Sequence, residues 1–330
     1  MIKALHLPFK NNNAGSTTLD INQISTALKD RKGLLWVDML IDEPHEAEKI
    51  LRDVFEFHPL AIEDALHESH IPAMNDWGDY IYLTIHAAPT FSVTQNDMDT
   101  IELDIFFGIN YLVTYHTMPI IALEQVWDHH LRGGYPNNQT PGRILYNILD
   151  EIAMDYTKLT GNLDDDIEDL QQKVINEEHI QDLMETILAT RNMLSKLRRV
   201  IAPQAELLNR MARGGHSLLP QADLFFYRDV YDHFARLNQE VENLRDMSSV
   251  ALEVYLSVIN NRMNNIMKTL TVITTLFMPL SFLTGFFGMN FFQPTFSNNW
   301  TSIPSFLITL AILVSIPGAM FLWMRRRTWL

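Results

Sequence analysis

The sequence predicts an α+β cytoplasmic domain, in which helices sandwich a β-sheet, followed by a long stalk helix and two transmembrane helices. Three observations predict this architecture. Residues 269–324 form a stretch of 56 residues without Asp, Glu, Lys or Arg, which is long enough for two spans. Residues 221–278 contain neither Gly nor Pro, as a long helix requires. Residues 1–120 alternate short β-type runs with helical runs.

The first region, residues 1–140, is expected to form the α/β domain. Apolar runs with β-branched and aromatic residues indicate strands, and Gly108 with Ile109 marks a hairpin turn between two of them. Pro59 is suited to the first turn of a helix. The expected strands are Leu34–Asp38, Tyr80–His86, Thr100–Phe107 and Asn110–His116, and the expected helices are Glu46–Phe57 and Pro59–His67.

Helices dominate the rest of the soluble region. Residues 141–220 are expected to form a helical hairpin of the cytoplasmic domain, and residues 221–268 the cytoplasmic part of the stalk helix. From Asp223 to Phe287 the helical pattern covers 65 residues, or about 98 Å at 1.5 Å per residue. A bilayer accounts for about 30 Å of this length. A ring of such parallel helices would form a funnel that leads to a pore.

The uncharged stretch predicts transmembrane helices at residues 269–287 and 303–324, joined by an external loop at residues 288–302. A buried helical hairpin in a soluble protein is the alternative. Lys268 precedes the first span, and the basic tail of residues 325–330 follows the second. Basic residues at membrane borders stay in the cytoplasm, which places both termini there. Residues 1–15 show no apolar run typical of a signal peptide. The basic residues of the tail are Arg325, Arg326 and Arg327.

One face of the first span is small and polar. Positions that repeat at intervals of three and four share a helix face, and here that face holds no aliphatic residue. It has the composition of a pore wall, although each hydroxyl could instead bond to its own helix backbone. The positions are Asn264, Met267, Thr271, Thr274, Met278, Ser281, Gly285 and Gly288.

Composition excludes several functions. The formal net charge is −15, with 40 acidic and 25 basic residues, which disfavours nucleic acid as a partner and suits cations. The chain has no cysteine, so it has neither thiolate metal sites nor a cysteine nucleophile. It also lacks the phosphate loop that binds nucleotides, the serine elbow and the zinc-protease motif. A membrane-anchored enzyme or scaffold is therefore the weaker interpretation, and no organic cofactor is expected.

Several segments together carry a family resemblance. Gly288-Met289-Asn290 ends the first of two C-terminal spans and follows Met278–Phe282. Residues 58–66, residues 227–233 and the basic C-terminal tail fit the same pattern. The chain thereby resembles the CorA family of divalent-cation channels, from about residue 34 to the C-terminus.

The resemblance implies a funnel-shaped homopentamer in the cell (inner) membrane. It would be a passive channel that imports Mg²⁺, with Co²⁺ and Ni²⁺ also carried, and is driven by the membrane potential. Gly288, Met289 and Asn290 would form the selectivity filter. The periodicity described above adds Thr274 to the pore positions that the family implies. The pore-lining and gating residues would be Asn264, Met267, Leu270, Thr274, Met278, Ser281 and Gly285.

The resemblance also implies regulation by the transported ion. Asp64 and Asp229 would bind cytoplasmic Mg²⁺ between neighbouring subunits, with Glu63 and Asp232 assisting, and the bound metal would favour the closed state. One departure from the family pattern is Phe287, where a Tyr commonly precedes the Gly.

Zinc is the alternative ion within the same superfamily. Glu63, His67 and His70 are spaced i, i+4 and i+7, which puts them on one helix face. Carboxylate and imidazole ligands suit a borderline-soft metal such as Zn²⁺. A solvated helix face explains the same spacing, and Met289 favours Mg²⁺ or Co²⁺ because a zinc-transporting branch has Val at this position.

Overall fold

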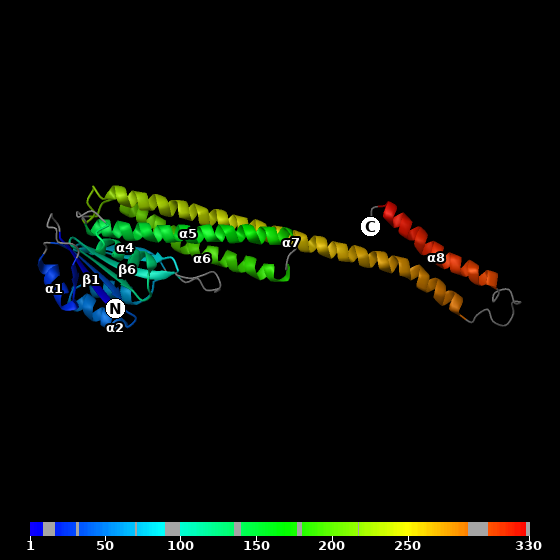
Figure 1. Ribbon diagram of the computed structural model, residues 1–330, viewed down its shortest axis with the longest axis horizontal. Coiled ribbons are helices and arrows are strands. Elements are labelled where there is room, and N and C mark those ends of the chain that lie inside the picture. Colours follow the sequence, from blue (N-terminus) through cyan, green and yellow to red (C-terminus); the bar gives the residue numbers. More distant parts are fainter. Residues whose placement is uncertain are drawn as a thin grey trace. The chain divides into compact units, whose positions relative to one another are not determined.

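The computed structural model describes residues 1–8, 17–30, 33–69, 71–89, 100–134, 140–176, 180–216, 218–289 and 303–327. The chain divides into two compact units, Met1–Leu252 and Glu253–Leu330 (Figure 1). The strands are β1 (Ile2–Pro8), β2 (Thr17–Leu19), β3 (Gly33–Leu40), β4 (Ala73–Asp76), β5 (Tyr80–Ala87), β6 (Ile101–Gly108) and β7 (Tyr111–His116). The helices are α1 (Ile21–Asp30), α2 (Pro44–Asp53), α3 (Pro59–Leu66), α4 (Ile121–Leu131), α5 (Pro141–Ile175), α6 (Ile180–Arg213), α7 (Leu224–Gly288) and α8 (Ile303–Arg326).

A seven-stranded sheet forms the centre of the first unit, in the order β2-β1-β3-β7-β6-β5-β4. β3 and β7 are parallel, and all other neighbouring strands are antiparallel. β6 and β7 form the predicted hairpin. β6 ends at Gly108, where a side chain would not fit because a Cβ would lie 2.3 Å from the ring of Tyr111. The sheet is thus mixed and is buried on both faces, as the unbroken burial of β3 and β5 shows.

Helices cover both faces of the sheet, which gives a three-layer sandwich (Figure 1). On one face α1, α2 and α3 pack against Leu35, Val37 and Phe106. On the other face α4 and the long helices pack against Trp36 and Ile105. Neighbouring residues of one strand point to opposite faces, so each strand contributes to both cores.

The first part of α7 packs with α5 and α6 in the first unit. Its buried residues repeat at intervals of three and four, which gives the helix one apolar face. The Tyr227 hydroxyl donates a 2.8 Å hydrogen bond to the Gly142 carbonyl, and a Cβ on Gly142 would lie 3.1 Å from that hydroxyl. The start of α7 is therefore fixed against the start of α5. The buried residues are Tyr227, Val230, Phe234, Leu237, Val241 and Leu244.

The second unit contains the end of α7 and all of α8. Within the described residues, these two helices are long and apolar enough to cross a membrane. On each helix a single stripe is less exposed than the rest of the surface, and we call it the covered stripe. It comprises Val272, Thr275, Leu276, Pro279, Leu280 and Leu283 on α7, and Thr309, Leu313, Ile316, Pro317, Met320 and Met324 on α8.

The structure confirms the predicted class of fold, but some predicted elements differ from it. The predicted helix 46–57 ends at Asp53, because Glu56 takes a left-handed conformation with φ 56°. His58 is then extended, as a residue before proline tends to be. The sequence reasoning missed β1, β2, β4, α1 and α4.

Candidate pore helix and metal-binding cluster

The predicted pore residues lie on one unbroken helix, α7. Within this chain they are open to the surroundings: Met267, Leu270 and Met278 are 56%, 55% and 67% exposed. Large apolar side chains at such exposure need lipid or another protein surface around them. We call the side of α7 that carries these residues the uncovered face. It comprises Asn264, Met267, Leu270, Thr274, Met278, Ser281 and Gly285.

The uncovered face lies opposite the covered stripe. Val272 is the most buried α7 residue of that stripe, at 7% exposure. At about 100° per residue, Thr274 lies about 200° and Met278 about 240° around the helix from Val272. The side of α7 away from its intrachain contacts therefore carries polar positions that the sequence singled out, such as Thr274 and Ser281, together with large apolar side chains such as Leu270.

Threonine hydroxyls on α7 bond back to their own helix. Thr271 donates to the Met267 carbonyl at 2.7 Å, and Thr274 donates to the Leu270 carbonyl at 2.9 Å. This confirms, for these hydroxyls, the local bonding that the sequence left open. Their hydrogens are used within the helix, but the oxygen lone pairs remain available as acceptors.

The predicted filter begins where α7 ends. Gly288 is the last residue of the helix, and the Met289 amide donates to the Phe286 carbonyl at 3.3 Å. Met289 is 58% exposed. Asn290 lies outside the described residues, as do residues 291–302 of the predicted loop, so the geometry of the filter stays a prediction.

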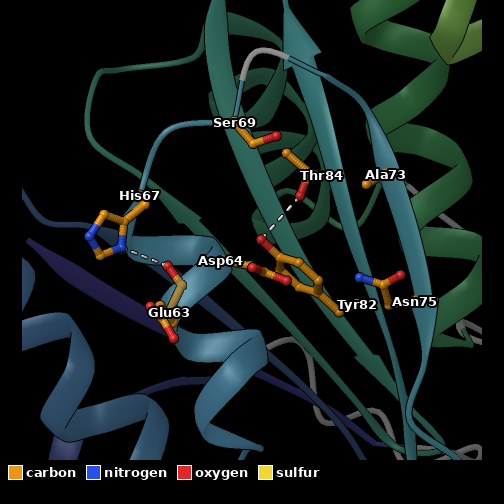
Figure 2. Close-up of a pocket in the computed structure, with 8 residues that line it drawn as sticks. All are labelled: Glu63, Asp64, His67, Ser69, Ala73, Asn75, Tyr82 and Thr84. Carbon is orange, nitrogen blue, oxygen red and sulfur yellow. Dashed lines mark hydrogen bonds between the residues drawn. The ribbon is translucent and has the colours of Figure 1, made fainter.

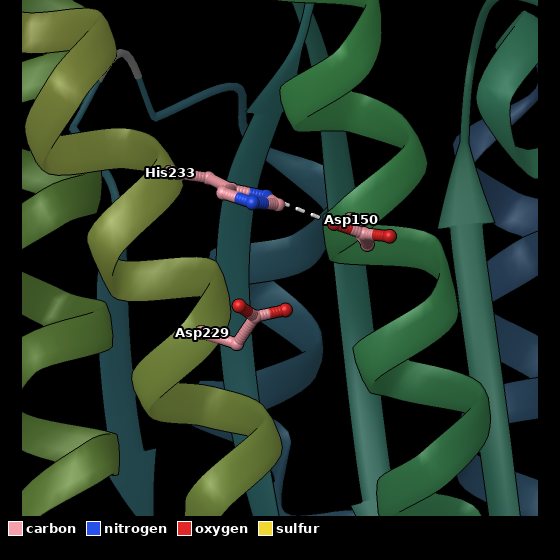
Figure 3. Close-up of side chains that lie close together, drawn as sticks. All are labelled: Asp150, Asp229 and His233. Carbon is pink, nitrogen blue, oxygen red and sulfur yellow. Dashed lines mark hydrogen bonds and ion pairs between the residues drawn. The ribbon is translucent and has the colours of Figure 1, made fainter.

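A second candidate site lies between α5 and α7 in the first unit. Asp150 on α5 faces Asp229 and His233 on α7 (Figure 3). One ligand atom from each lies within 4.8 Å of the others, and among the described residues this is the one such group of three or more. Asp150 Oδ1 and His233 Nδ1 are 3.0 Å apart, and the Tyr146 hydroxyl donates to Asp229 Oδ2 at 3.2 Å.

This cluster has the chemistry of a cation site. The side chains of Asp150 and His233 are 23% and 31% exposed, so water and ions can reach them. Carboxylate oxygens suit Mg²⁺, and the imidazole suits transition metals. Sequence reasoning found Asp229 but missed Asp150 and His233. The i, i+4 spacing of Asp229 and His233 was the available signal, whereas Asp150 lies 83 residues from His233.

Asp64 and Glu63 belong to a different part of the first unit. They lie on α3 and line a pocket of about 300 Å³ between that helix and the sheet (Figure 2). His67 Nδ1 lies 3.0 Å from the Glu63 carbonyl, and His70 is outside the described residues. Within one chain Asp64 therefore does not join the Asp229 cluster, and pairing between subunits stays a prediction. The other lining residues are Ser69, Ala73, Asn75, Tyr82 and Thr84.

A buried acid lies beneath the floor of this pocket. Asp104 on β6 is 2% exposed and accepts hydrogen bonds from the Tyr82 hydroxyl at 2.6 Å and from Thr84 Oγ1 at 3.2 Å. Burial raises the pKa of Asp104 well above its ordinary value, and the negative charges of Glu102 and Asp64 raise it further. The raised pKa means that the neutral, protonated form of this carboxyl group is favoured relative to that of an exposed aspartic acid.

Basic residues lie at both predicted membrane borders. Lys268 stands on α7 directly before the uncharged stretch, and Arg325 and Arg326 end α8.

Asp232 is exposed on α7, three residues after Asp229. A sheet domain joined to two helices that are apolar enough to cross a membrane, with one cluster of two carboxylates and a histidine, is the combination expected of a membrane protein that handles cations.

Comparison with known proteins gives the family. The profile described as "CorA-like Mg2+ transporter protein" matches residues 31–326. The chain therefore belongs to the CorA family of divalent-cation transporters, which are membrane transporters rather than enzymes.

Three similar proteins cover almost the whole chain. YfjQ of Bacillus subtilis, named as a metal ion transporter, is 31% identical over 89% of both chains. The cobalt/magnesium transport protein CorA of Thermotoga maritima is 26% identical, covering 95% of this chain and 88% of that one. The structure of the CorA magnesium transporter of Methanocaldococcus jannaschii matches with a TM-score of 0.84 at 23% identity, over 100% of this chain and 99% of that one.

Proposed function

We propose that the chain forms a homopentameric channel that imports Mg²⁺ passively, with Co²⁺ and Ni²⁺ as further substrates. The observation that carries the proposal is the uncovered face of α7. Within the predicted span this face carries Thr274 and Ser281, and although the Thr274 hydrogen is bonded within the helix, the acceptor lone pairs of such hydroxyls find no partner in lipid. The same face is favourable around a water-filled pore. Five copies of α7 would then line the pore, and α8 would surround them.

Ion selection is assigned to the Gly288-Met289-Asn290 segment. Mg²⁺ gives up its water reluctantly. A ring of five Asn290 amide oxygens, with Gly288 carbonyls nearby, would hold the ion through its water shell. A carboxylate ring would hold it more tightly and release it more slowly, and conduction requires release.

The membrane potential supplies the driving force. At 100 mV, inside negative, a divalent cation gains about 4.6 kcal/mol on entry. No nucleotide is required. Lys268 and the basic residues after α8 support an orientation with both termini in the cytoplasm, because basic residues at membrane borders stay on that side.

Regulation is assigned to acidic residues of the first unit. Asp64 of one subunit and Asp229 of its neighbour would bind cytoplasmic Mg²⁺, with Glu63 and Asp232 nearby. Asp150 adds a further carboxylate beside Asp229 in the same chain, and such oxygen ligands suit a hard cation. A bound cation offsets the repulsion between the carboxylates and thereby favours the closed state.

Ion flux into sealed liposomes tests the function. Purified protein should admit Mg²⁺ without nucleotide, faster when the interior is negative, whereas protein-free liposomes should not. Mg²⁺, Co²⁺ and Zn²⁺ are measured in parallel. Entry of Zn²⁺ alone would favour the zinc alternative, and absence of any flux would contradict the channel.

A further inference from the structure

Thr274 is a polar residue between two large apolar ones on the uncovered face of α7. Leu270 lies one turn before it and Met278 one turn after it, each about 6 Å along the helix axis. Rings of such apolar side chains can close a pore by excluding water. A hydroxyl at the middle of this segment requires an explanation.

The position and bonding of Thr274 indicate what it presents to the pore. It lies about 200° around α7 from Val272, almost opposite the covered stripe. Its Oγ1 donates to the Leu270 carbonyl at 2.9 Å. A hydroxyl has one hydrogen and two acceptor lone pairs. Because the hydrogen is used within the helix, the hydroxyl offers only acceptors to any group in front of it.

We propose that five Thr274 hydroxyls form an acceptor-only ring that binds the water shell of a hydrated divalent cation between the two apolar rings. Thr274 would therefore be a specificity-determining residue. The inference rests on the proposed function, because it requires the uncovered face to line the pore.

The polarity of the water shell explains the selectivity. Water molecules around a cation turn their oxygens to the ion and their hydrogens outward, so the shell needs acceptors. Water molecules around an anion turn the other way, so that shell needs donors. A ring whose hydroxyl hydrogens are already bonded within the helix supplies acceptors alone. Since Mg²⁺ keeps its water, this ring would stabilise the hydrated ion where apolar walls cannot.

Thr274→Val tests the ring because it removes the hydroxyl and preserves the shape. Mg²⁺ uptake into liposomes with equal amounts of pentamer should fall about tenfold, which corresponds to about 1.4 kcal/mol in the barrier. The matched control, Thr274→Ser, retains a hydroxyl that can bond to the same carbonyl, and its uptake should stay within about twofold of wild type. Wild-type uptake by Thr274→Val would overturn the ring.

A labelling experiment tests the position independently of conductance. The chain has no cysteine, so a single introduced thiol is the only target. Thr274→Cys should react with a water-soluble cationic methanethiosulfonate and lose uptake, whereas Val272→Cys on the covered stripe should not react. Reaction at Val272→Cys with protection at Thr274→Cys would overturn the assignment.

The outcome for Asn290→Ala separates this inference from the proposed function. If Asn290→Ala abolishes uptake and Thr274→Val does not change it, the channel stands and the ring is wrong. If the wild-type protein carries no divalent cation, both are wrong.

Discussion

The two parts of α7 differ in what surrounds them, although the helix is continuous. In the first unit its large apolar side chains are buried: Tyr227, Val230 and Phe234 are each 0% exposed. In the second unit Leu270 and Met278 are 55% and 67% exposed. Both parts repeat apolar residues at intervals of three and four. The spacing therefore predicts a helix, but it does not tell which surface will cover the helix.

Charge makes the distinction that spacing cannot. The first unit balances its apolar core with charged residues on its surface, whereas residues 269–324 carry no charge on either side of the helix. At about 25 cal/mol per Å² of apolar surface, exposure of both helices to water would be strongly unfavourable. The second part of α7 is stable only with lipid and neighbouring helices around it. Changes there should affect transport, and changes in the first part should affect regulation and stability.

The largest effect is expected at the predicted filter. Asn290→Ala removes the amide ring, and Mg²⁺ uptake should fall about a hundredfold or more. This fall corresponds to an increase of about 2.7 kcal/mol in the free-energy barrier to transport. Uptake is measured in liposomes together with the oligomeric state. Asn298→Ala, which removes another amide from the same predicted loop, is the matched control and should transport normally. Normal uptake by a pentameric Asn290→Ala variant would contradict the filter assignment.

The next effect concerns the apolar segment of the uncovered face. Leu270→Ser or Met278→Ser should wet the constriction, because water gains a hydrogen-bonding partner there. Basal current in high Mg²⁺ should rise several-fold in planar bilayers. Leu307→Ser on α8 is the control, since Leu307 is equally exposed at 55% but lies on the helix assigned to the outside of the pore. An unchanged current in both α7 variants would place these residues against lipid.

A smaller effect is expected from the acids of the first unit. Asp229→Lys or Asp64→Lys supplies a permanent positive charge that mimics the bound metal. These variants should resist protease without Mg²⁺, whereas the wild-type protein should be protected only with Mg²⁺.

The control for these lysine variants is Asp165→Lys. Asp165 is an exposed acid on α5, away from the Asp150 cluster. In protease digestion, this control should be protected by Mg²⁺ and cleaved without it, as the wild-type protein is expected to be. If the protease resistance of both Asp229→Lys and Asp64→Lys still depended on Mg²⁺ as in the wild-type protein, these acids would be excluded as the Mg²⁺ sensor.

The sequence predicted the elements whose signals are local. The hairpin at Gly108 and the helix start at Pro59 appear in the structure, and the helix predicted at Asp223–Phe287 is observed at Leu224–Gly288. The missed strands β1 and β4 have no strong local pattern, and their place comes from pairing with β3 and β5. Asp150 was missed for the same reason, because tertiary packing alone brings it to Asp229 and His233. Distant partners are set by the packing of α5 against α7, which a single sequence does not display.

The smallest effect concerns Asp104, the buried acid of the sheet. Its pKa is raised in the folded state, so on raising the pH the unfolded chain loses this proton first. The contribution of Asp104 to the free energy of unfolding should therefore fall as the pH rises above about 4, the ordinary pKa of an aspartic acid.

Asp104→Asn tests this sign, because asparagine keeps an acceptor for the Tyr82 hydroxyl and cannot ionise. Between pH 5 and pH 8 the melting temperature of the wild-type protein in detergent should fall more than that of Asp104→Asn, because the pKa of Asp104 is raised in the folded state. Asp165→Asn serves as the control for a loss of negative charge and should follow the wild-type profile. Parallel profiles for the wild-type protein and Asp104→Asn would show that Asp104 ionises in the folded state much as it does in the unfolded chain. The core beneath the Asp64 pocket would then hold a negative charge. Asp104 would have to be counted with Asp64 and Glu63 among the carboxylates that attract the proposed cation.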